Sequence, residues 1–255
     1  MARVKPRSRL DPPYLRRVWL DRNRVATTEE YPFCLPLFRD PEFELTFERP
    51  LAIFTGENGV GKSTLLEGIA ALAGFDEAGG GKGYRAVDHS LAIEAMGSRL
   101  GDGLRASWLP KITDGWFFRS ESFFSVARYL DAAAMEVGAA PPDFLSHSHG
   151  EGFLRFFEER CRRRGLFIFD EPEAALSPSR QIDFLKIVLR MIEVGKAQVI
   201  MATHSPLLMA CPGAQLMAIK KYGVSPTSLG DIGHFRLLRE FYSDPDCFIQ
   251  AMLSE

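Results

Sequence analysis

Cysteine and long apolar runs are both scarce in this 255-residue chain, and each shortage excludes a class of protein. The four cysteines, Cys34, Cys161, Cys211 and Cys247, lie far apart, with no C-x-x-C pair and no histidine at ligand spacing. This pattern argues against structural zinc and against a disulfide framework. No apolar run approaches the ~20 residues that a membrane-spanning helix needs, and no apolar stretch follows the basic residues near Met1. We therefore expect no stable membrane insertion, no secretory signal, and a reduced, cytoplasmic location.

A strong charge of one sign is lacking as well. The formal net charge is −2, which argues against a surface that coats nucleic acid but leaves room for a local basic groove. What is present is an ordinary globular composition, with 46% hydrophobic and 25% charged residues. The length suits one large α/β domain or two small ones, and the motifs favour a single domain over residues 1–255.

A glycine-rich stretch between a strand and a helix is the dominant motif. Residues 51–55 form a short apolar run, which predicts a buried strand, and apolar residues at helical spacing follow residue 64 as far as Gly74. The stretch between them matches the pattern G-x-x-x-x-G-K-[ST], whose backbone N–H groups and helix N-terminus cradle the phosphates of a nucleoside triphosphate. Its residues are Gly56, Glu57, Asn58, Gly59, Val60, Gly61, Lys62, Ser63 and Thr64.

Two side chains of this glycine loop have defined chemistry. Lys62 is expected to reach the β- and γ-phosphates, and the Ser63 hydroxyl is expected to ligate Mg²⁺. The sequence therefore predicts binding of ATP or GTP. A second glycine run at residues 79–83 is a weaker alternative, because no strand precedes it and no helix signal follows it.

An acidic pair follows a second apolar strand. The run 166–169 ends in Asp170 and Glu171. Asp170 is expected beside Ser63, where its carboxylate can hold hydrated Mg²⁺, and Glu171 is expected to polarise a water in line with the γ-phosphate. Because the pair follows a complete glycine loop, it favours a nucleoside triphosphatase.

The rest of the pattern predicts an α/β fold, with a mostly parallel core sheet flanked by helices. Further core strands are expected at 199–202 and about 216–219. Alternating residues at 14–20 and 43–48 predict a small antiparallel layer, and short strands are expected at 104–109 and 115–119.

Helices are predicted mainly from apolar spacing. One covers 122–135, one runs from about residue 150 to the Arg162–Arg164 run, and one extends from Ser177 to Gly195. The arginine run is better explained by the helix C-terminus than by DNA contact. The tail from residue 234 is expected to be helical, with a break near residues 244–245. The expected inward face of the helix after Ser177 comprises Ile182, Leu185, Val188, Leu189 and Ile192.

These motifs resemble those of ATP-binding-cassette (ABC) ATPases. The run from Asp170 to Pro178 is similar to their Walker B and D-loop segment, and Thr203-His204 resembles their switch histidine. Ser148-His149-Gly150-Glu151 is similar to their signature sequence, although His and Glu stand where transporters usually have Gly and Gln. The motifs follow the family's order over residues 15–220 and imply a P-loop NTPase fold with a helical signature subdomain at about 120–164.

The resemblance also implies a mechanism. Such domains enclose two ATP molecules between two head-to-tail subunits, so we expect a homodimer on ATP binding. Ser148 and Gly150 would meet the γ-phosphate held by the other subunit, through a helix N-terminus. His204 would contact the γ-phosphate from its own subunit and help fix the attacking water.

The sequence departs from the family pattern at several points. The family's Q-loop glutamine has no clear counterpart, and Glu121 is the candidate for its metal- or water-linked role, with Arg119 as an alternative. Ser177 stands where the D-loop usually has Asp. Tyr31 and Phe33 are both candidates for stacking on adenine. The other histidines, His89, His147, His149 and His234, are interpreted as structural or surface residues.

Three features resemble the soluble branch of the family, which holds SMC-type, RecF-like and small stand-alone ATPases. They are Glu57-Asn58 in the glycine loop, the acidic end of the signature, and Glu173 after Pro172. No heptads separate the glycine loop from the signature, so no coiled-coil arms are expected. The leading hypothesis is a soluble Mg-ATPase linked to DNA maintenance or phage defence, with DNA or an effector protein as partner. The alternatives are the ATP-binding subunit of a membrane transporter and a slow ATP-gated interaction clamp.

Overall fold

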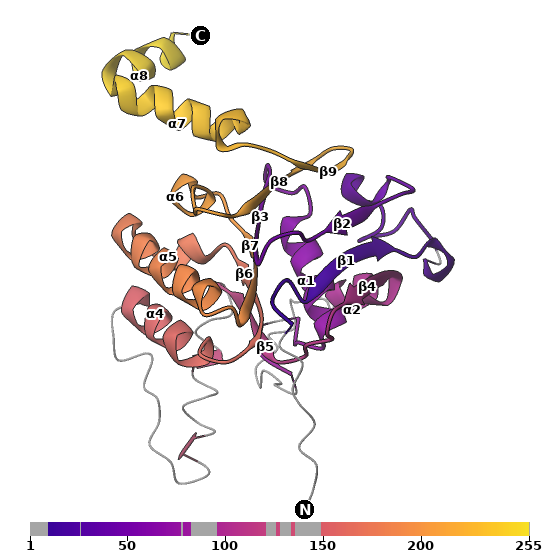
Figure 1. The fold of residues 1–255 in the computed structure, drawn as a ribbon. Helices are drawn as coiled ribbons and strands as arrows, with labels where there is room; N and C mark the ends of the chain where they lie inside the picture. Colours follow the sequence, from indigo (N-terminus) through magenta and orange to yellow (C-terminus); the bar gives the residue numbers. More distant parts are fainter. Residues whose placement is uncertain are drawn as a thin grey trace, which may run out of the picture.

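The protein is built around a six-stranded sheet with helices on both faces (Figure 1). The computed structural model describes residues 10–25, 27–77, 79–82, 96–120, 126–127, 134–135 and 149–254. The strand order is β5-β6-β7-β3-β8-β9, and all neighbours are parallel except β8 and β9. The strands are β3 (Leu51–Thr55), β5 (Gly115–Arg119), β6 (Gly165–Asp170), β7 (Ala197–Ala202), β8 (Gln215–Lys220) and β9 (Gly223–Pro226).

The central strands are buried on both faces. Every residue of β3, β6 and β7 is buried. Helices cover both faces of a parallel sheet, which explains why these strands appear as continuous apolar runs rather than alternating ones. The predicted core strands at 51–55, 166–169, 199–202 and 216–219 are all confirmed, whereas β9 was not predicted.

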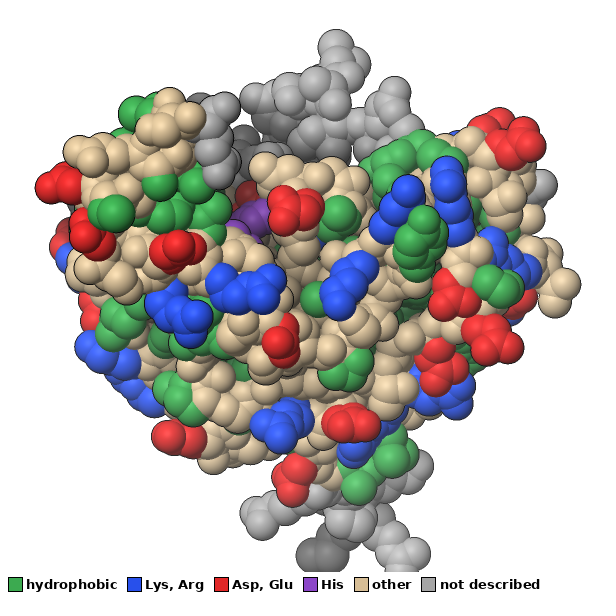
Figure 2. All heavy atoms as spheres, turned by 90° about the horizontal axis from the view of Figure 1, so that it is seen from above, with side chains coloured by type: hydrophobic (Ala, Val, Ile, Leu, Met, Phe, Trp, Pro, Cys, Tyr) green, Lys and Arg blue, Asp and Glu red, His purple; other side chains and the backbone are tan. Residues whose placement is uncertain are grey.

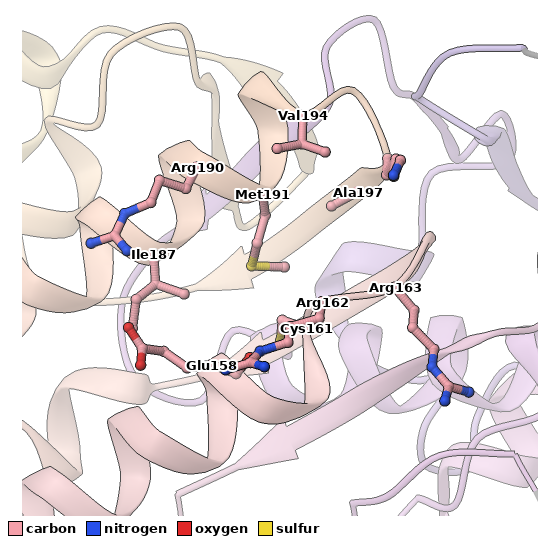
Figure 3. A pocket seen from close by; sticks show the side chains of 10 residues that line it. Glu158, Cys161, Arg162, Arg163, Ile187, Arg190, Met191, Val194 and Ala197 are labelled. Carbon is pink, nitrogen blue, oxygen red and sulfur yellow. The ribbon is translucent and has the colours of Figure 1, made fainter.

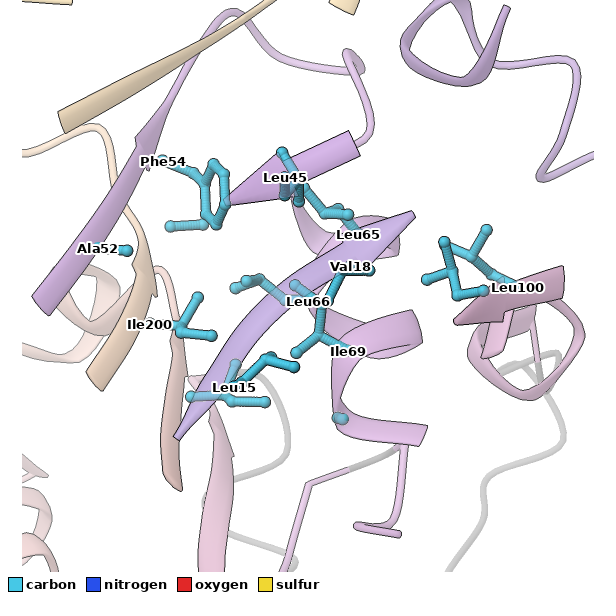
Figure 4. Close-up of a cluster of buried hydrophobic side chains, with 14 of the residues drawn as sticks. Leu15, Val18, Leu45, Ala52, Phe54, Leu65, Leu66, Ile69, Leu100 and Ile200 are labelled. Atoms are coloured by element: carbon cyan, nitrogen blue, oxygen red, sulfur yellow. The ribbon is translucent and has the colours of Figure 1, made fainter. Parts of the chain in front are cut away.

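A second, antiparallel sheet lies over one face of the core. Its order is β2-β1-β4, with β1 (Leu15–Leu20), β2 (Glu44–Thr46) and β4 (Leu104–Trp108). Helix α1 (Lys62–Ala73) lies between the two sheets, and α2 (Met96–Gly103) packs against α1. Figure 4 shows Leu15 and Val18 of β1 facing Leu66 and Ile69 of α1. The predicted antiparallel layer is thus confirmed.

Helices α4 (His149–Arg160), α5 (Pro178–Glu193) and α6 (Pro206–Met209) cover the opposite face of the core sheet (Figure 1). Their contact is dominated by buried phenylalanines. The ring of Phe157 on α4 lies 5.1 Å from that of Phe169 on β6 and 5.3 Å from that of Phe184 on α5. The Phe157–Phe169 pair is edge-to-face, a geometry that adds stability beyond the area that the rings bury.

The predicted inward face of α5 is confirmed in part: Val188 is buried, and Leu185, Leu189 and Ile192 are partly buried against the core. The prediction is wrong at Ile182. Ile182 is 41% exposed, and the buried residues of α5 are Gln181, Phe184, Ile187, Val188 and Met191. A polar residue is buried because its amide is satisfied: Gln181 Nε2 donates to the Leu176 carbonyl at 3.0 Å, and Gln181 Oε1 accepts from Ser205 Oγ. Apolar spacing alone could not reveal that partner.

Short helices and a C-terminal pair complete the described fold. Helices α7 (Gly233–Ser243) and α8 (Pro245–Leu253) confirm the predicted break, where Asp244 accepts a hydrogen bond from the Cys247 N–H. Helix α4 ends at Arg160 rather than in the arginine run, and Arg162 Nε donates to the Glu158 carbonyl near that end. The helix predicted at 122–135 lies largely outside the described residues. The 3₁₀ helices are η1 (Arg22–Arg24), η2 (Pro36–Phe38), η3 (Pro172–Ala175) and η4 (Leu229–Asp231).

One buried glutamine joins the two sheets. Gln198 of β7 is 0% exposed, and its Oε1 accepts hydrogen bonds from the backbone N–H groups of Tyr14 and Leu15, both at 2.8 Å. Its Nε2 donates to the Leu15 carbonyl at 2.9 Å. The side chain therefore provides hydrogen-bond partners for three backbone groups at the start of β1, namely the N–H groups of Tyr14 and Leu15 and the Leu15 carbonyl.

We expect Gln198→Met to lower the free energy of unfolding by about 3 kcal/mol or more, because it leaves buried donors and an acceptor without partners. Urea unfolding followed by circular dichroism measures this change. Gln215→Met is the matched control: Gln215 also bridges two backbone groups, Glu48 N–H and the Thr46 carbonyl, but water reaches them. Equal losses in the two variants would contradict the role assigned to Gln198.

Candidate functional site

The predicted site residues converge at one edge of the core sheet. In the register of the sheet, Phe54 of β3 and Asp170 of β6 both pair with Ala202 of β7. The three segments that follow these strands therefore leave the sheet side by side. They are the glycine loop, the acidic pair and the Thr203-His204 segment.

The glycine loop has the conformation of a phosphate cradle. Gly59 and Gly61 have φ values of 77° and 97°, which favour glycine, and a Cβ on Gly61 would lie 3.1 Å from Leu35 Cδ1. No side chain caps the N-terminus of α1, which leaves its first N–H groups directed at the loop. Lys62 Nζ donates to the carbonyls of Gly56 and Glu57, both at 3.0 Å. The lysine thus closes the loop from within.

Burial and the nearby acidic side chains act in opposite directions on the pKa of Lys62. Desolvation lowers the pKa of Lys62 from its ordinary value, while Glu171 and Asp170 act in the opposite direction. A phosphate placed in the loop would supply the negative charge that favours a protonated lysine.

Ser63 and Asp170 are in direct contact. Ser63 Oγ donates to Asp170 Oδ1 at 3.1 Å. Burial raises the pKa of Asp170 to about 6, against the opposing effects of Arg119 and Ser63. A hydroxyl and a buried carboxylate side by side fit Mg²⁺, which uses one or two protein oxygens together with the phosphates of the substrate. Among the residues that the structure describes, no cluster of three or more His, Cys, Asp or Glu could hold a metal alone.

An ion-pair network supports the carboxylate. Arg119, the last residue of β5, donates from Nη1 to Glu67 Oε1 of α1 at 2.7 Å, and its Nε lies 3.8 Å from Asp170 Oδ2. Arg119 therefore occupies the place where sequence reasoning looked for a Q-loop residue. Glu121, the first choice, lies outside the described residues.

Glu171 has a backbone conformation that side chains rarely adopt. Its φ and ψ are 48° and 54°, and no other non-glycine residue in the described part of the chain has a positive φ. Hydrogen bonds fix this geometry: the Glu171 N–H donates to the Ala202 carbonyl at 3.0 Å, and Ser120 Oγ donates to the Glu171 carbonyl at 2.6 Å. Strained residues that the surroundings hold in place are common at active sites.

His204 lies beside Glu171, with its Nε2 3.6 Å from Glu171 Oε1. Burial is the largest cause that lowers the pKa of His204. The backbone N–H of His204 donates to Glu173 Oε1 at 2.6 Å. The sequence analysis gave Glu173 no role in the site. Its position two residues after Glu171, across Pro172, is the one feature of the sequence that could have indicated such a role.

The signature residues are only partly described. Ser148 lies outside the described residues, and Gly150 lies in the first turn of α4, which begins at His149. Figure 1 shows α4 and α1 on opposite faces of the core sheet. Glu151 is paired with Arg180 of α5.

The two candidates for adenine stacking differ. Phe33 is 5% exposed and belongs to the hydrophobic core, so its ring is not available to a base. Tyr31 is 39% exposed, and its hydroxyl lies 2.6 Å from Thr64 Oγ1, next to the glycine loop. Tyr31 stays a candidate.

Two other features, the second glycine run and a cavity, lie outside the site built from these motifs. In the second glycine run, the Gly80 N–H and carbonyl both bond to Phe117, so this backbone is already engaged. A cavity of about 380 Å³ lies between the C-terminal ends of α4 and α5, lined by Cys161, Met191 and Arg190 among others (Figure 3). It opens beside the first residues of β7, at the opposite end of the strands from the glycine loop.

Asp170 gives a testable pH dependence in protein without nucleotide or metal. Its folded pKa of about 6 exceeds the unfolded value of about 3.9, so the contribution of Asp170 to stability is most favourable below about pH 4 and falls as the pH rises to about 6. We expect Asp170→Asn to abolish this pH-dependent contribution and to raise the free energy of unfolding at pH 7.5 by about 3 kcal/mol. Thermal unfolding in EDTA from pH 4 to 8 measures both effects.

Asp183→Asn is the control for this measurement. Asp183 is solvated, and its pKa is lowered mainly by a hydrogen bond from Lys186, so this variant is not stabilised at pH 7.5. A loss of stability in Asp170→Asn at pH 7.5 would contradict the assigned cost of the buried charge.

Comparison with known proteins agrees with this site. Residues 145–210 match a family described as "AAA domain, putative AbiEii toxin, Type IV TA system", and residues 37–99 match a family described as "AAA domain". The chain is similar to the cytochrome c biogenesis ATP-binding export protein CcmA of Bartonella quintana (strain Toulouse). They are 27% identical over 197 residues, which is 73% of this chain and 88% of the relative.

Two solved structures are also similar. One is described as "An inward-facing conformation of a putative metal-chelate type ABC transporter", with 16% identity, coverage of 75% of this chain and 77% of the other, and a TM-score of 0.45. The other is the SMC head domain from Thermotoga maritima, with 12% identity, coverage of 84% and 99%, and a TM-score of 0.47. The geometry of the glycine loop and the two AAA-domain matches together support a P-loop ATPase.

Proposed function

We propose that the chain hydrolyses ATP in a Mg²⁺-dependent reaction that requires an ATP-induced, head-to-tail homodimer. The observation that carries this proposal is the contact of Ser63 with Asp170 next to Glu171 and His204. A hydroxyl and a carboxylate for a metal, followed by a carboxylate and an imidazole for a water, are the groups that phosphoryl transfer to water requires.

Each side chain has one task in this reaction. Lys62 leaves its two carbonyl partners and binds the β- and γ-phosphates, as the phosphates fill the loop. Ser63 and Asp170 would hold Mg²⁺, which would supply positive charge to neutralise the phosphate oxygens. Glu171 accepts a hydrogen bond from the attacking water, and His204 orients this water or a γ-phosphate oxygen. The strained backbone of Glu171 fixes the direction of its carboxylate.

The position of α4 supports the proposed dimerisation. Helix α4 and helix α1 lie on opposite faces of one sheet (Figure 1), which supports a role for Ser148 and Gly150 at the nucleotide of a second copy. The N–H groups in the first turn of α4 would then bind the γ-phosphate. ATP thereby joins the two copies, and hydrolysis separates them.

The proposed output is that of a soluble, cytoplasmic ATPase acting in DNA maintenance or defence, with DNA or an effector protein as partner. All four cysteines are free in the structure, which fits a reducing compartment. Among the described residues, no helix has both the length and the apolar character to cross a bilayer.

Similarity to an ATP-binding export protein favours a second candidate, the ATPase subunit of a transporter. The two candidate functions differ in the partner that they require. A transporter subunit needs a permease. The leading proposal instead predicts ATPase activity that changes when double- or single-stranded DNA or an effector is added. Unchanged activity with both forms of DNA would remove the support for a DNA role.

The central test is Glu171→Gln. Loss of the carboxylate that activates water should lower kcat by about 100-fold or more and should trap an ATP-bound dimer, because binding is retained while hydrolysis is lost. Size-exclusion chromatography with Mg-ATP measures the dimer, and phosphate release measures kcat. Glu193→Gln, at the exposed end of α5, should behave as wild type. A Glu171→Gln variant that stays monomeric in saturating ATP would refute the dimer mechanism.

A further inference from the structure

A second imidazole, which the sequence analysis interpreted as structural or surface, lies next to the switch histidine. His234 is the second residue of α7, and its ring centroid is 6.1 Å from that of His204, with the ring planes 52° apart. The sequence separates the two by the whole of α6, β8 and β9. The fold brings them together at the edge where the glycine loop and Glu171 lie.

Both imidazoles have a polar atom without a protein partner. Nε2 of His204 and Nε2 of His234 are shielded from solvent, and neither has a hydrogen bond to another described residue. The 3.6 Å between His204 Nε2 and Glu171 Oε1 is too long for one. Buried nitrogens of this kind normally have a partner, so a water or a ligand oxygen is expected to lie against them.

The charge around the pair suits a small oxygen ligand. Burial, then Lys62, lower the pKa of His204; Glu171 and Glu173 act in the opposite direction, and His234 lowers it further. A neutral imidazole at pH 7 can donate or accept at Nε2, as an attacking water or a phosphate oxygen requires. Figure 2 shows histidine side chains recessed in a hollow of this face, beside acidic side chains.

Helices α7 and α8 form a C-terminal helical hairpin, and only the first turn of α7 packs against the described body of the protein. Ile232, which precedes α7, is 7% exposed, and Phe235 packs against the same core cluster. The Ile232 N–H donates to the Leu229 carbonyl of η4. Beyond this turn, neither α7 nor α8 has a buried residue. The body of the protein therefore fixes the part of the hairpin that carries His234.

We propose that His234 is a further positioning residue of the ATPase site, which together with His204 holds the attacking water or a γ-phosphate oxygen facing Glu171. This inference rests on the proposed hydrolysis and extends the site to the C-terminal hairpin. No bond to phosphorus forms on His234; it aligns the oxygen that Glu171 activates. A histidine with only a structural role in this turn would have a protein partner for its buried Nε2.

The test compares three substitutions at His234 by steady-state ATPase kinetics and by equilibrium binding of ATP. His234→Ala should lower kcat about tenfold and leave KM and the Kd for ATP within about twofold. His234→Gln should keep most of the activity, because its amide nitrogen lies near the position of Nε2, and His234→Asn should resemble the alanine variant. The His204→Ala/His234→Ala double variant should lose less than the product of the two single losses, because the residues act as a unit.

Arg236→Ala is the matched control, since Arg236 lies two residues further along the same helix and is exposed; its kinetics should be those of wild type. Equal kcat in His234→Ala and wild type would overturn the inference and leave the proposed function standing. A fall in melting temperature and ATP binding together with kcat, without rescue by glutamine, would show a structural role and also overturn it. If His234→Ala does not fold, the contrast between His234→Gln and His234→Asn decides. A wild-type protein that hydrolyses no ATP would overturn the proposed function, and this inference with it.

Discussion

The site depends on one arrangement of strands: β7 lies between β3 and β6 and pairs in parallel with both. Parallel neighbours bring their carboxyl ends to the same edge of a sheet, and ligands bind there in open α/β folds. The glycine loop, the acidic pair and His204 each follow one of these three strands. Their separation in the sequence is therefore irrelevant to their separation in space.

This arrangement also creates the electrostatic problem that the site must solve. Asp170 ends a fully buried strand, and burial raises its pKa to about 6. Ser63 and Arg119 offset part of that cost, whereas the charges of Glu171 and Glu67 add to it. A bound Mg²⁺ would offset more, so the protein is expected to bind metal and nucleotide with groups that are already in place.

Strain and support are combined at Glu171. Its left-handed backbone is unfavourable for a side chain with a Cβ, but hydrogen bonds from its N–H to β7 and from Ser120 to its carbonyl maintain it. Glu173 lies two residues after Glu171, in the 3₁₀ helix η3, and its carboxylate accepts a hydrogen bond from the backbone N–H of His204. The acidic segment thus positions both the proposed base and its neighbouring imidazole.

The sequence by itself determined the local parts. Apolar runs predicted β3, β6 and most of β7, because strands buried on both faces are mainly apolar. The glycine pattern predicted the loop, because few other residues adopt its backbone angles. The order of the motifs along the chain indicated Asp170, Glu171 and His204 as candidate site residues.

Only the tertiary structure decided what depends on partners distant in the chain. Gln181 and Gln198 are buried because distant backbone and side-chain groups satisfy them, so polarity misled the prediction for α5. Arg119 meets Asp170 and Glu67 because β5 pairs with β6, next to α1, and Phe33 is in the core rather than at a nucleotide. His234 approaches His204 because η4 and Ile232 direct α7 back to the sheet edge. Spacing encodes which face of an element is apolar, but hydrogen bonds and charge pairs between distant elements decide which polar residues share a site.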